Sequence, residues 1–174
     1  ENWGSVLAVL FGLRFDFNHL KELLLQNELL VLNKLDYRLE AFTSFKGIDF
    51  CDDSKATVLQ ATYMAVKRLS AFKRPIILIL GGVGKGVDRS RVCSILSRYN
   101  QIKQIYCFGR ECCLMGFDKD YESIDEVVDQ IFSVAVTGDI VLFSPSGASF
   151  DLFQNYQQRG KAFKELVFKK IDSL

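Results

Sequence analysis

The sequence predicts an α/β domain with a mostly parallel, Rossmann-like sheet that is covered by helices on both faces. From Cys51 onward, short apolar runs of strand length alternate with longer segments whose apolar residues recur at helical spacing. This alternation is typical of parallel sheets, because a chain that forms two parallel neighbours needs a long crossover, usually a helix, between them. An alternating apolar and polar stretch before Cys51 adds a β-hairpin at the amino-terminal side of the sheet.

The hairpin and one helix are expected first along the chain. Leu39–Phe45 and Ile48–Cys51 alternate apolar and polar residues, and the Lys46–Gly47 pair between them suits a tight turn. The spacing of the next apolar residues predicts a helix that buries Ala61, Ala65, Val66 and Leu69.

A buried strand is expected next, because Pro75–Leu80 is a continuous apolar run that ends in Gly81–Gly82. The later elements follow from helical spacing, from a capping box and from a second apolar run. They are a helix over Arg89–Tyr99, a strand over Gln104–Phe108, a helix from the capping box Ser123–Glu126 to about Val136, a strand over Ile140–Phe143 and a helix over Gly160–Ile171.

Residues 1–36 are expected to belong to a neighbouring domain and a connector, with the main domain over 37–174. Ser5–Leu13 is apolar and resembles the end of a helix, and Phe17–Gln26 resembles a short helix that begins after Asp16. Asn27–Leu35 has no clean period and is interpreted as the connector. The single histidine, His19, is interpreted as a surface residue. Because the chain does not begin with Met, we expect it to be part of a longer protein.

The composition is that of an ordinary soluble domain. Of the 174 residues, 49% are hydrophobic and 25% charged, and 22 Lys and Arg nearly balance 21 Asp and Glu. A protein that coats nucleic acid usually has a basic excess, so we expect no nucleic-acid partner. The apolar runs Val6–Phe11 and Pro75–Leu80 are far shorter than the roughly 20 residues that cross a bilayer. We therefore expect no membrane partner and a cytoplasmic location.

The five cysteines are expected to be reduced, as in a cytosolic protein. Their number is odd, no C-x-x-C pair occurs, and with one histidine a structural zinc site is not expected. The adjacent pair Cys112–Cys113 suits packing, with redox sensing as the alternative.

Ligands of such folds gather at the carboxyl ends of the strands, which directs attention to three loops: Asp52–Thr57, Gly81–Val87 and Ser144–Asp151. Gly81–Gly86 is neither a Walker A loop nor a dinucleotide-binding motif, because Ile79 and Gly86 replace required residues of the first and Val87 breaks the second. It is either a tight turn with a solvated lysine, or a loop whose amides and Lys85 bind an anion.

The other two loops have similar alternatives. In Asp52–Thr57, Asp53 or Ser54 could simply be the N-cap of the next helix, although two acids, a lysine and two hydroxyls make a dense polar set. Ser144–Asp151 consists largely of small residues, which allow a backbone to approach a ligand closely.

Taken together, the loops resemble one family in order and spacing. The resemblance covers residues 37–174 and is to the C-terminal domain of the D-glutamate-adding members of the Mur ligase family. It rests on Tyr37-Arg38-x-Glu40, Asp53-Ser54-Lys55-Ala56-Thr57, Gly81-Gly82-x-Gly84-Lys85, Ser144-Pro145-x-x-Ala148-Ser149-Phe150-Asp151 and Asn155-Tyr156-x-x-Arg159-Gly160.

The resemblance implies an ATP-dependent ligase that forms a carbon–nitrogen bond between D-glutamate and UDP-N-acetylmuramoyl-L-alanine in peptidoglycan synthesis. It implies ATP and Mg²⁺ as cofactors of the complete enzyme, neither bound by this chain alone, and the central and N-terminal domains of the same enzyme as partners. No catalytic and no metal-binding residue is implied here, because the family's P-loop lies in the central domain. The alternative is a free-standing ligand-binding or regulatory module with the same fold.

The resemblance also implies roles for individual residues. For nucleotide binding these are Arg38 and Asp53, and for D-glutamate binding they are Lys55, Thr57, Lys85, Ser149 and Tyr156. A dicarboxylate needs two separate groups of donors, each worth roughly 1.5–3 kcal/mol per charge-assisted hydrogen bond, and two such groups would orient the amine. The sequence departs from the family pattern at Tyr37, Val58, Val83 and Tyr156, and in the opening stretch at Glu1 and Ser5.

Overall fold

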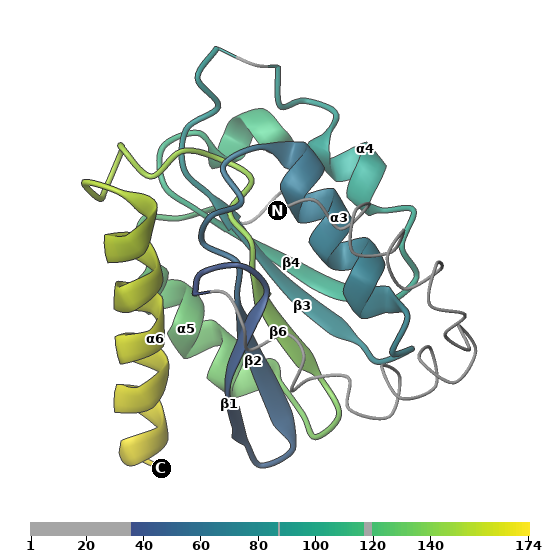
Figure 1. The fold of residues 1–174 in the computed structure, drawn as a ribbon, viewed down its shortest axis with the longest axis vertical. Coiled ribbons are helices and arrows are strands. Elements are labelled where there is room, and N and C mark those ends of the chain that lie inside the picture. The colour runs from purple at the N-terminus through teal and green to yellow at the C-terminus, as the bar shows by residue number, and fades with distance from the viewer. Residues whose placement is uncertain (1–35, 87, 117–119) are drawn as a thin grey trace, which may run out of the picture. The chain divides into compact units, whose positions relative to one another are not determined.

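A computed structural model of the chain describes residues 36–86, 88–116 and 120–174, all within one compact unit, Asn33–Leu174 (Figure 1). Several expectations fall outside the described residues: the helices at Ser5–Leu13 and Phe17–Gln26, the connector Asn27–Leu35, and the surface position of His19. The domain division at residue 36 stays a prediction.

A six-stranded sheet forms the centre of the described domain, with the strand order β1-β2-β6-β3-β4-β5. Only β1 is antiparallel to its neighbour, and the other pairs are parallel, so the predicted mostly parallel sheet with an amino-terminal hairpin is confirmed. The strands are β1 (Glu40–Phe45), β2 (Ile48–Asp52), β3 (Ile76–Gly81), β4 (Ile102–Phe108), β5 (Asp120–Tyr121) and β6 (Ile140–Phe143).

Helices cover both faces of the sheet, as predicted (Figure 1). They are α3 (Leu59–Ser70), α4 (Val92–Leu96), the 3-10 helix η2 (Cys112–Met115), α5 (Ile124–Val134) and α6 (Tyr156–Asp172). The helices α5 and α6 pack on one face and α3 and α4 on the other. Every residue of β3 is buried, because both faces of this central strand are covered.

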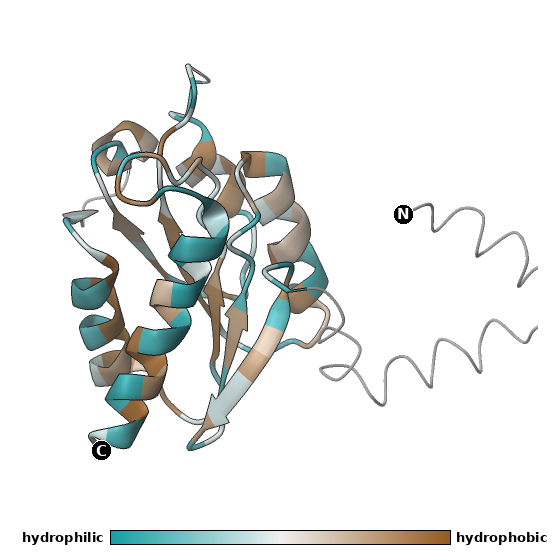
Figure 2. Cartoon of the chain, turned by 60° about the vertical axis from the view of Figure 1, so that its left-hand side comes forward, coloured by the Kyte–Doolittle hydropathy of each residue, from teal (hydrophilic) through white to brown (hydrophobic). Residues whose placement is uncertain are grey.

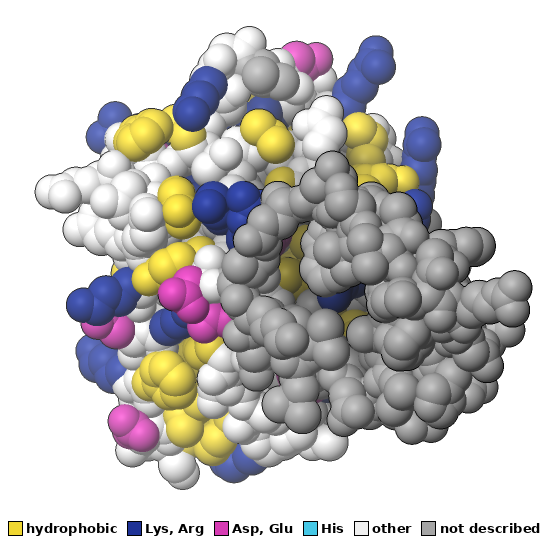
Figure 3. Space-filling model, in the orientation of Figure 1, with side chains coloured by type: hydrophobic (Ala, Val, Ile, Leu, Met, Phe, Trp, Pro, Cys, Tyr) yellow, Lys and Arg dark blue, Asp and Glu magenta, His cyan; other side chains and the backbone are white. Residues whose placement is uncertain are grey.

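The side chains follow this layering. Figure 2 shows hydrophobic residues along the strands and on the sides of the helices that face them, with hydrophilic residues outside. On the visible face in Figure 3, Lys and Arg side chains of the described part are scattered among hydrophobic and acidic ones rather than gathered in one broad patch. No helix among the described residues is long and apolar enough to cross a membrane.

Side-chain caps explain where two helices begin. The Ser123 hydroxyl accepts a hydrogen bond from the Glu126 amide at 3.3 Å, so the predicted cap starts α5. The Asn155 side chain accepts from the Gln158 amide at 2.8 Å, so α6 begins four residues before the predicted Gly160.

Gly160 therefore lies inside α6, where its role is close approach rather than helix initiation. A Cβ atom there would come within 2.5 Å of the Ser54 hydroxyl oxygen and 2.8 Å of Asp52 Oδ2. Helix α4 is also shorter than the predicted Arg89–Tyr99, because Arg89 lies before it with its side chain turned into the loops.

The cysteine expectation is wrong for one pair, because Cys107 and Cys112 form a disulfide. Cys107 lies near the end of β4, and the chain turns back at Gly109, with φ +89°, before Cys112 begins η2. This turn brings the two Cα atoms to 5.6 Å, a normal separation for a disulfide. Cys51 is a free buried thiol and Cys113 a free exposed one.

Candidate functional site at the carboxyl edge of the sheet

The three loops predicted from the sequence meet at the carboxyl edge of the sheet. The β3–α4 and β6–α6 loops form a two-residue bridge, in which the amides of Val83 and Ala148 each donate to the carbonyl of the other at 2.8 Å. A cleft of about 350 Å³ lies where the β2–α3 loop joins them, with Thr57, Gly84 and Ser146 among its lining residues.

Arg159 of α6 connects the β2–α3 and β6–α6 loops through hydrogen bonds of its side chain. Its side chain is completely buried, and it donates to the Gly147 carbonyl at 2.9 Å and to the Ser54 carbonyl at 2.8 Å. Burial lowers the pKa of Arg159 to about 10, with Asp151 the leading influence that raises it, so the guanidinium stays charged at neutral pH. A buried charge that binds carbonyls of the β2–α3 and β6–α6 loops holds their spacing.

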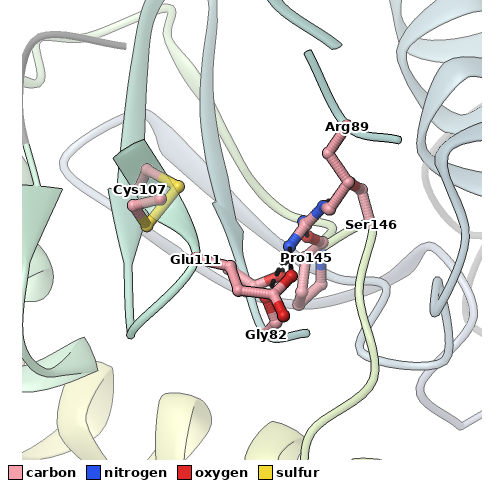
Figure 4. Close-up of a disulfide and its surroundings, with 8 residues drawn as sticks. Gly82, Arg89, Cys107, Glu111, Pro145 and Ser146 are labelled. Carbon is pink, nitrogen blue, oxygen red and sulfur yellow. Dashed lines mark hydrogen bonds and ion pairs between the residues drawn. A yellow bond between two sulfur atoms is a disulfide. The ribbon is translucent and has the colours of Figure 1, made fainter. Parts of the chain in front are cut away.

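Arg89 does the same for the β3–α4 and β6–α6 loops. It donates to the carbonyls of Gly82 at 2.5 Å and Gly81 at 3.0 Å, and to the Ser146 hydroxyl at 3.2 Å (Figure 4). Sequence reasoning assigned no role to either arginine. Arg159 does stand in one of the resembling runs, but no pattern marks a residue whose partners are carbonyls from distant loops.

Three backbone amides of the glycine loop donate hydrogen bonds to partners within the chain. The Gly81 amide donates to the Pro145 carbonyl at 2.9 Å, the Val83 amide to Ala148, and the Gly84 amide to the Glu111 carboxylate at 2.7 Å. These three amides are therefore occupied by partners within the chain, and whether the loop binds an external anion stays a prediction. The Lys85 side chain stays the predicted anion-binding group of the loop.

The Lys85 side chain is exposed, and its backbone has a left-handed conformation with φ +52°. Its Nζ atom is 5.6 Å from the ring centroid of Phe150, which is 67% exposed. Ser149, the residue before Phe150, is buried. Two residues predicted to bind carboxylates thus come from neighbouring loops, with Lys85 exposed and Ser149 buried.

The remaining predicted acceptor residues divide between the cleft and the start of α6. Thr57 is half-buried and lines the cleft. The Lys55 side chain is exposed, with Nζ 5.3 Å from the ring centroid of Tyr156, the first residue of α6. The Tyr156 ring also meets Tyr37 edge to face, with centroids 5.9 Å apart. Lys55 and Tyr156 therefore lie together, and the structure records no direct contact between them and Lys85.

Asp53 is no helix cap, because the N-cap of α3 is Val58 and no side chain caps that helix. The capping interpretation of Asp53 and Ser54 is wrong. Asp53 is instead 8% exposed, and its carboxylate accepts hydrogen bonds from the Leu39 amide at 3.1 Å and the Ser144 hydroxyl at 2.7 Å. Burial raises the pKa of Asp53 to about 7, although both hydrogen bonds oppose the rise.

Arg38 is exposed in the turn that Asp53 holds, and its charge is near enough to lower the pKa of Asp53. The two predicted nucleotide-binding residues are therefore neighbours. Both residues that flank Arg38 have positive φ, +63° at Tyr37 and +46° at Leu39. Such conformations persist in non-glycine residues only where surrounding contacts hold them.

A second acidic residue, Asp52 at the end of β2, is fully buried next to the site. Lys164 Nζ lies 3.4 Å from Asp52 Oδ2 and 2.5 Å from Glu40 Oε2. Burial raises the pKa of Asp52, with Ser54 and Lys164 opposing it. This ion-pair group joins the hairpin to α6 and supports the turn at Tyr37.

Among residues 36–174 that the structure describes, no three His, Cys, Asp or Glu side chains gather in a way that could hold a metal ion. The described residues thus offer no cluster that could hold a metal ion by side chains alone, and no step of the chemistry is assigned to a metal here.

Comparison with known proteins identifies relatives for most of the chain. It is 38% identical over 146 residues to the UDP-N-acetylmuramoylalanine–D-glutamate ligase of Hydrogenobaculum sp. (strain Y04AAS1), covering 80% of this chain and 34% of the relative. The ligase of the same name from Thermosipho africanus is 37% identical over 142 residues, covering 78% and 32%. That of Vibrio atlanticus is 33% identical over 165 residues, covering 92% and 36%. The chain thus spans about a third of these relatives. No protein-family model matches it.

Solved structures share the fold at low sequence identity. A MurF ligase from Thermotoga maritima in complex with ADP superimposes with a TM-score of 0.59 at 17% identity, covering 80% of this chain and 32% of that one. A murein peptide ligase from Psychrobacter arcticus gives 0.58 at 11%, covering 80% and 30%. Because identity to these structures is so low, they establish the fold alone. With the sequence relatives, they lead to one conclusion: over the matched residues, this chain belongs to the Mur ligase family.

Proposed function

We propose that this chain is the C-terminal domain of an ATP-dependent ligase that adds D-glutamate to UDP-N-acetylmuramoyl-L-alanine. The observation that carries the proposal is the 38% identity over 146 residues to a protein of that name, in a chain that spans about a third of it. The geometry agrees with an acceptor site, because the loops meet at the edge where such sheets bind ligands.

In the proposed reaction, the complete enzyme uses ATP to phosphorylate the carboxylate of the nucleotide precursor. The amine of D-glutamate then attacks this acyl phosphate, the new carbon–nitrogen bond forms, and phosphate leaves. The residues of this chain bind and orient the acceptor and do not take part in proton or phosphoryl transfer. Orientation of a nucleophile removes part of the entropic barrier, which is the contribution expected of this domain.

The acceptor is a dicarboxylate, and the site offers donors in separate places. We assign one carboxylate to Lys85 and Thr57, which come from the two loops beside the cleft. We assign the other to Ser149 and the start of α6 at Tyr156, with Lys55 adding positive charge beside that ring. Two separate anchors hold both ends of the acceptor and limit the directions in which its amine can project.

The nucleotide site is proposed to include Arg38 and Asp53 from this chain, with most of its contacts in the central domain. Solved relatives support nucleotide and metal use in the fold, since one structure is of a bifunctional folylpolyglutamate synthase/dihydrofolate synthase with Mn, AMPPNP and L-glutamate bound. The proposal places ATP, Mg²⁺ and the central and N-terminal domains in the complete enzyme, in the cytoplasm.

The test is product formation by the complete protein that contains this chain. Purified enzyme is supplied with ATP, magnesium, the nucleotide precursor and one amino acid at a time, and ADP release is followed together with product mass. ADP release that requires D-glutamate and yields the D-glutamyl product supports the proposal. ADP release with another amino acid in preference, or a gene without a P-loop upstream of Glu1, refutes it and favours a different ligase or the free-standing binding module.

A further inference from the structure

Glu111 contacts the glycine loop from a fourth loop, the one after β4. Its Oε2 atom accepts the hydrogen bond from the Gly84 amide at 2.7 Å and lies 3.6 Å from Arg89 Nη1 (Figure 4). The Glu111 side chain is 30% exposed, so this charge-assisted hydrogen bond is only partly screened by water. One carboxylate thus contacts both the glycine loop and the arginine that holds it.

The hydrogen bond between Glu111 and the Gly84 amide lies next to Lys85 in the glycine loop. Gly84 is the residue before Lys85, so the bound amide fixes the Val83–Gly84 peptide, one residue before the Cα atom that carries the Lys85 side chain. The amide of Val83, one residue earlier, is held by the Ala148 carbonyl at 2.8 Å. Two consecutive amides are therefore held, one from the β6–α6 loop and one by Glu111.

The disulfide holds Glu111 itself. Cys112 is the next residue, and its bond to Cys107 closes the turn from β4 into a small covalent ring that contains Glu111. Both sulfur-bearing residues are buried, Cys107 at 0% and Cys112 at 1% exposed. The backbone of Glu111 is thereby fixed to the central sheet rather than left in an open loop.

We propose that Glu111 is a positioning residue for the acceptor site, and that the Cys107–Cys112 disulfide keeps it in position, so that acceptor binding weakens when this pair is reduced. The inference rests on the proposed function of Lys85 in binding the acceptor carboxylate. Reduction by a dithiol breaks the sulfur–sulfur bond, places one hydrogen on each cysteine sulfur, and converts the dithiol to its own disulfide. The turn over residues 107–112 then opens, and Glu111 loses its fixed backbone.

Kinetics of the complete ligase test the positioning role with a matched control. Glu111→Gln keeps the size of the side chain but removes its charge, and Cys112→Ala removes the disulfide. Cys113→Ala is the control, because Cys113 is adjacent, exposed and unpaired. We expect the KM for D-glutamate to rise about tenfold in Glu111→Gln and several-fold in Cys112→Ala, with kcat and the KM for ATP within about twofold. A purely structural role would lower the melting temperature without this selective rise in KM.

Hydrogen exchange of the Gly84 amide in the 174-residue chain gives a reading that needs no ligand. It should become faster in Glu111→Gln, in Cys112→Ala and in wild type treated with dithiothreitol, and should stay unchanged in Cys113→Ala. If the amide responds in this way but the complete enzyme does not use D-glutamate, the positioning role stands and the proposed function fails. Unchanged exchange in Glu111→Gln overturns the inference. An unchanged D-glutamate KM after reduction, with both thiols verified by mass, overturns the redox part.

Discussion

The buried carboxyl group of Asp53 should make the stability of this domain depend on pH. Burial raises the pKa of Asp53 from 3.8 to about 7, so the folded state binds this proton more tightly than the unfolded state does. The stabilising contribution of the protonated form is therefore complete below about pH 4 and is lost as the pH rises through about 7. The difference between the pKa of Asp53 in the unfolded state and that in the folded state corresponds to about 4 kcal/mol of unfolding free energy.

Asp53→Asn should remove this dependence without breaking the local hydrogen bonds. The amide oxygen can still accept from Leu39, and the amide nitrogen can donate to the Ser144 hydroxyl. The Ser144 proton then goes to Thr62 Oγ1, which lies 2.9 Å away, while the Thr62 hydroxyl keeps its bond to the Ser144 carbonyl at 3.0 Å. The variant should therefore be at least as stable as wild type above about pH 7.

Urea unfolding of both proteins, followed by far-ultraviolet circular dichroism from about pH 4 to about pH 8, measures the effect. The advantage of Asp53→Asn over wild type should widen by up to about 4 kcal/mol as the pH rises, and should then level off. A difference that stays constant with pH would refute the reasoning, and so would one that widens toward low pH. In the complete enzyme the same variant should raise the KM for ATP several-fold and leave that for D-glutamate unchanged, as expected if Asp53 and Arg38 serve the nucleotide.

Four other outcomes follow from the site. Lys85→Ala should raise the KM for D-glutamate with little change in kcat, because a carboxylate is bound equally in the ground and transition states; a changed KM for ATP instead would contradict this role. Arg159→Met should lower the unfolding free energy by about 3–5 kcal/mol in urea titrations, since two buried carbonyls lose their charged partner. Gly82→Ala should destabilise far more than Gly86→Ala, because its Cβ would collide with the Ala148 carbonyl whereas Gly86 has open space around it; equal melting temperatures would count against this. This chain alone should release no phosphate from ATP, measured with the nucleotide precursor and D-glutamate present.

Pattern and periodicity were sufficient for the central sheet. The β6 strand has the predicted bounds Ile140–Phe143, and β3 differs from the predicted run by one residue at each end. Both strands are buried on two faces, so their apolar runs are continuous and easily recognised. The two-residue strand β5 at Asp120–Tyr121 was not predicted, because a strand so short has no period and exists only through its pairing with β4.

The site was predictable in location but not in its internal support. The three loops follow from the strand order, and the resemblance named the candidate ligands, whose roles stay predictions. The contacts of Arg89, Arg159 and Glu111 are with carbonyls and amides that come together only in the folded chain, so no local pattern signals them. The disulfide was not predicted, because the odd number of cysteines and the absence of C-x-x-C were interpreted as signs of reduced thiols. The two cysteines come together only when the chain turns back after β4.

The bridge between Val83 and Ala148 has a consequence for how tightly a ligand can bind. Because the two loops are already joined by backbone hydrogen bonds and by Arg89, their conformational entropy is lost when the domain folds, not when a ligand arrives. A dicarboxylate that contacts both loops would bring together no separate flexible segments, so more of each contact's free energy would appear as affinity. The exposed side chain of Lys85 is then the main part of the site whose rotamer freedom ligand binding must still restrict.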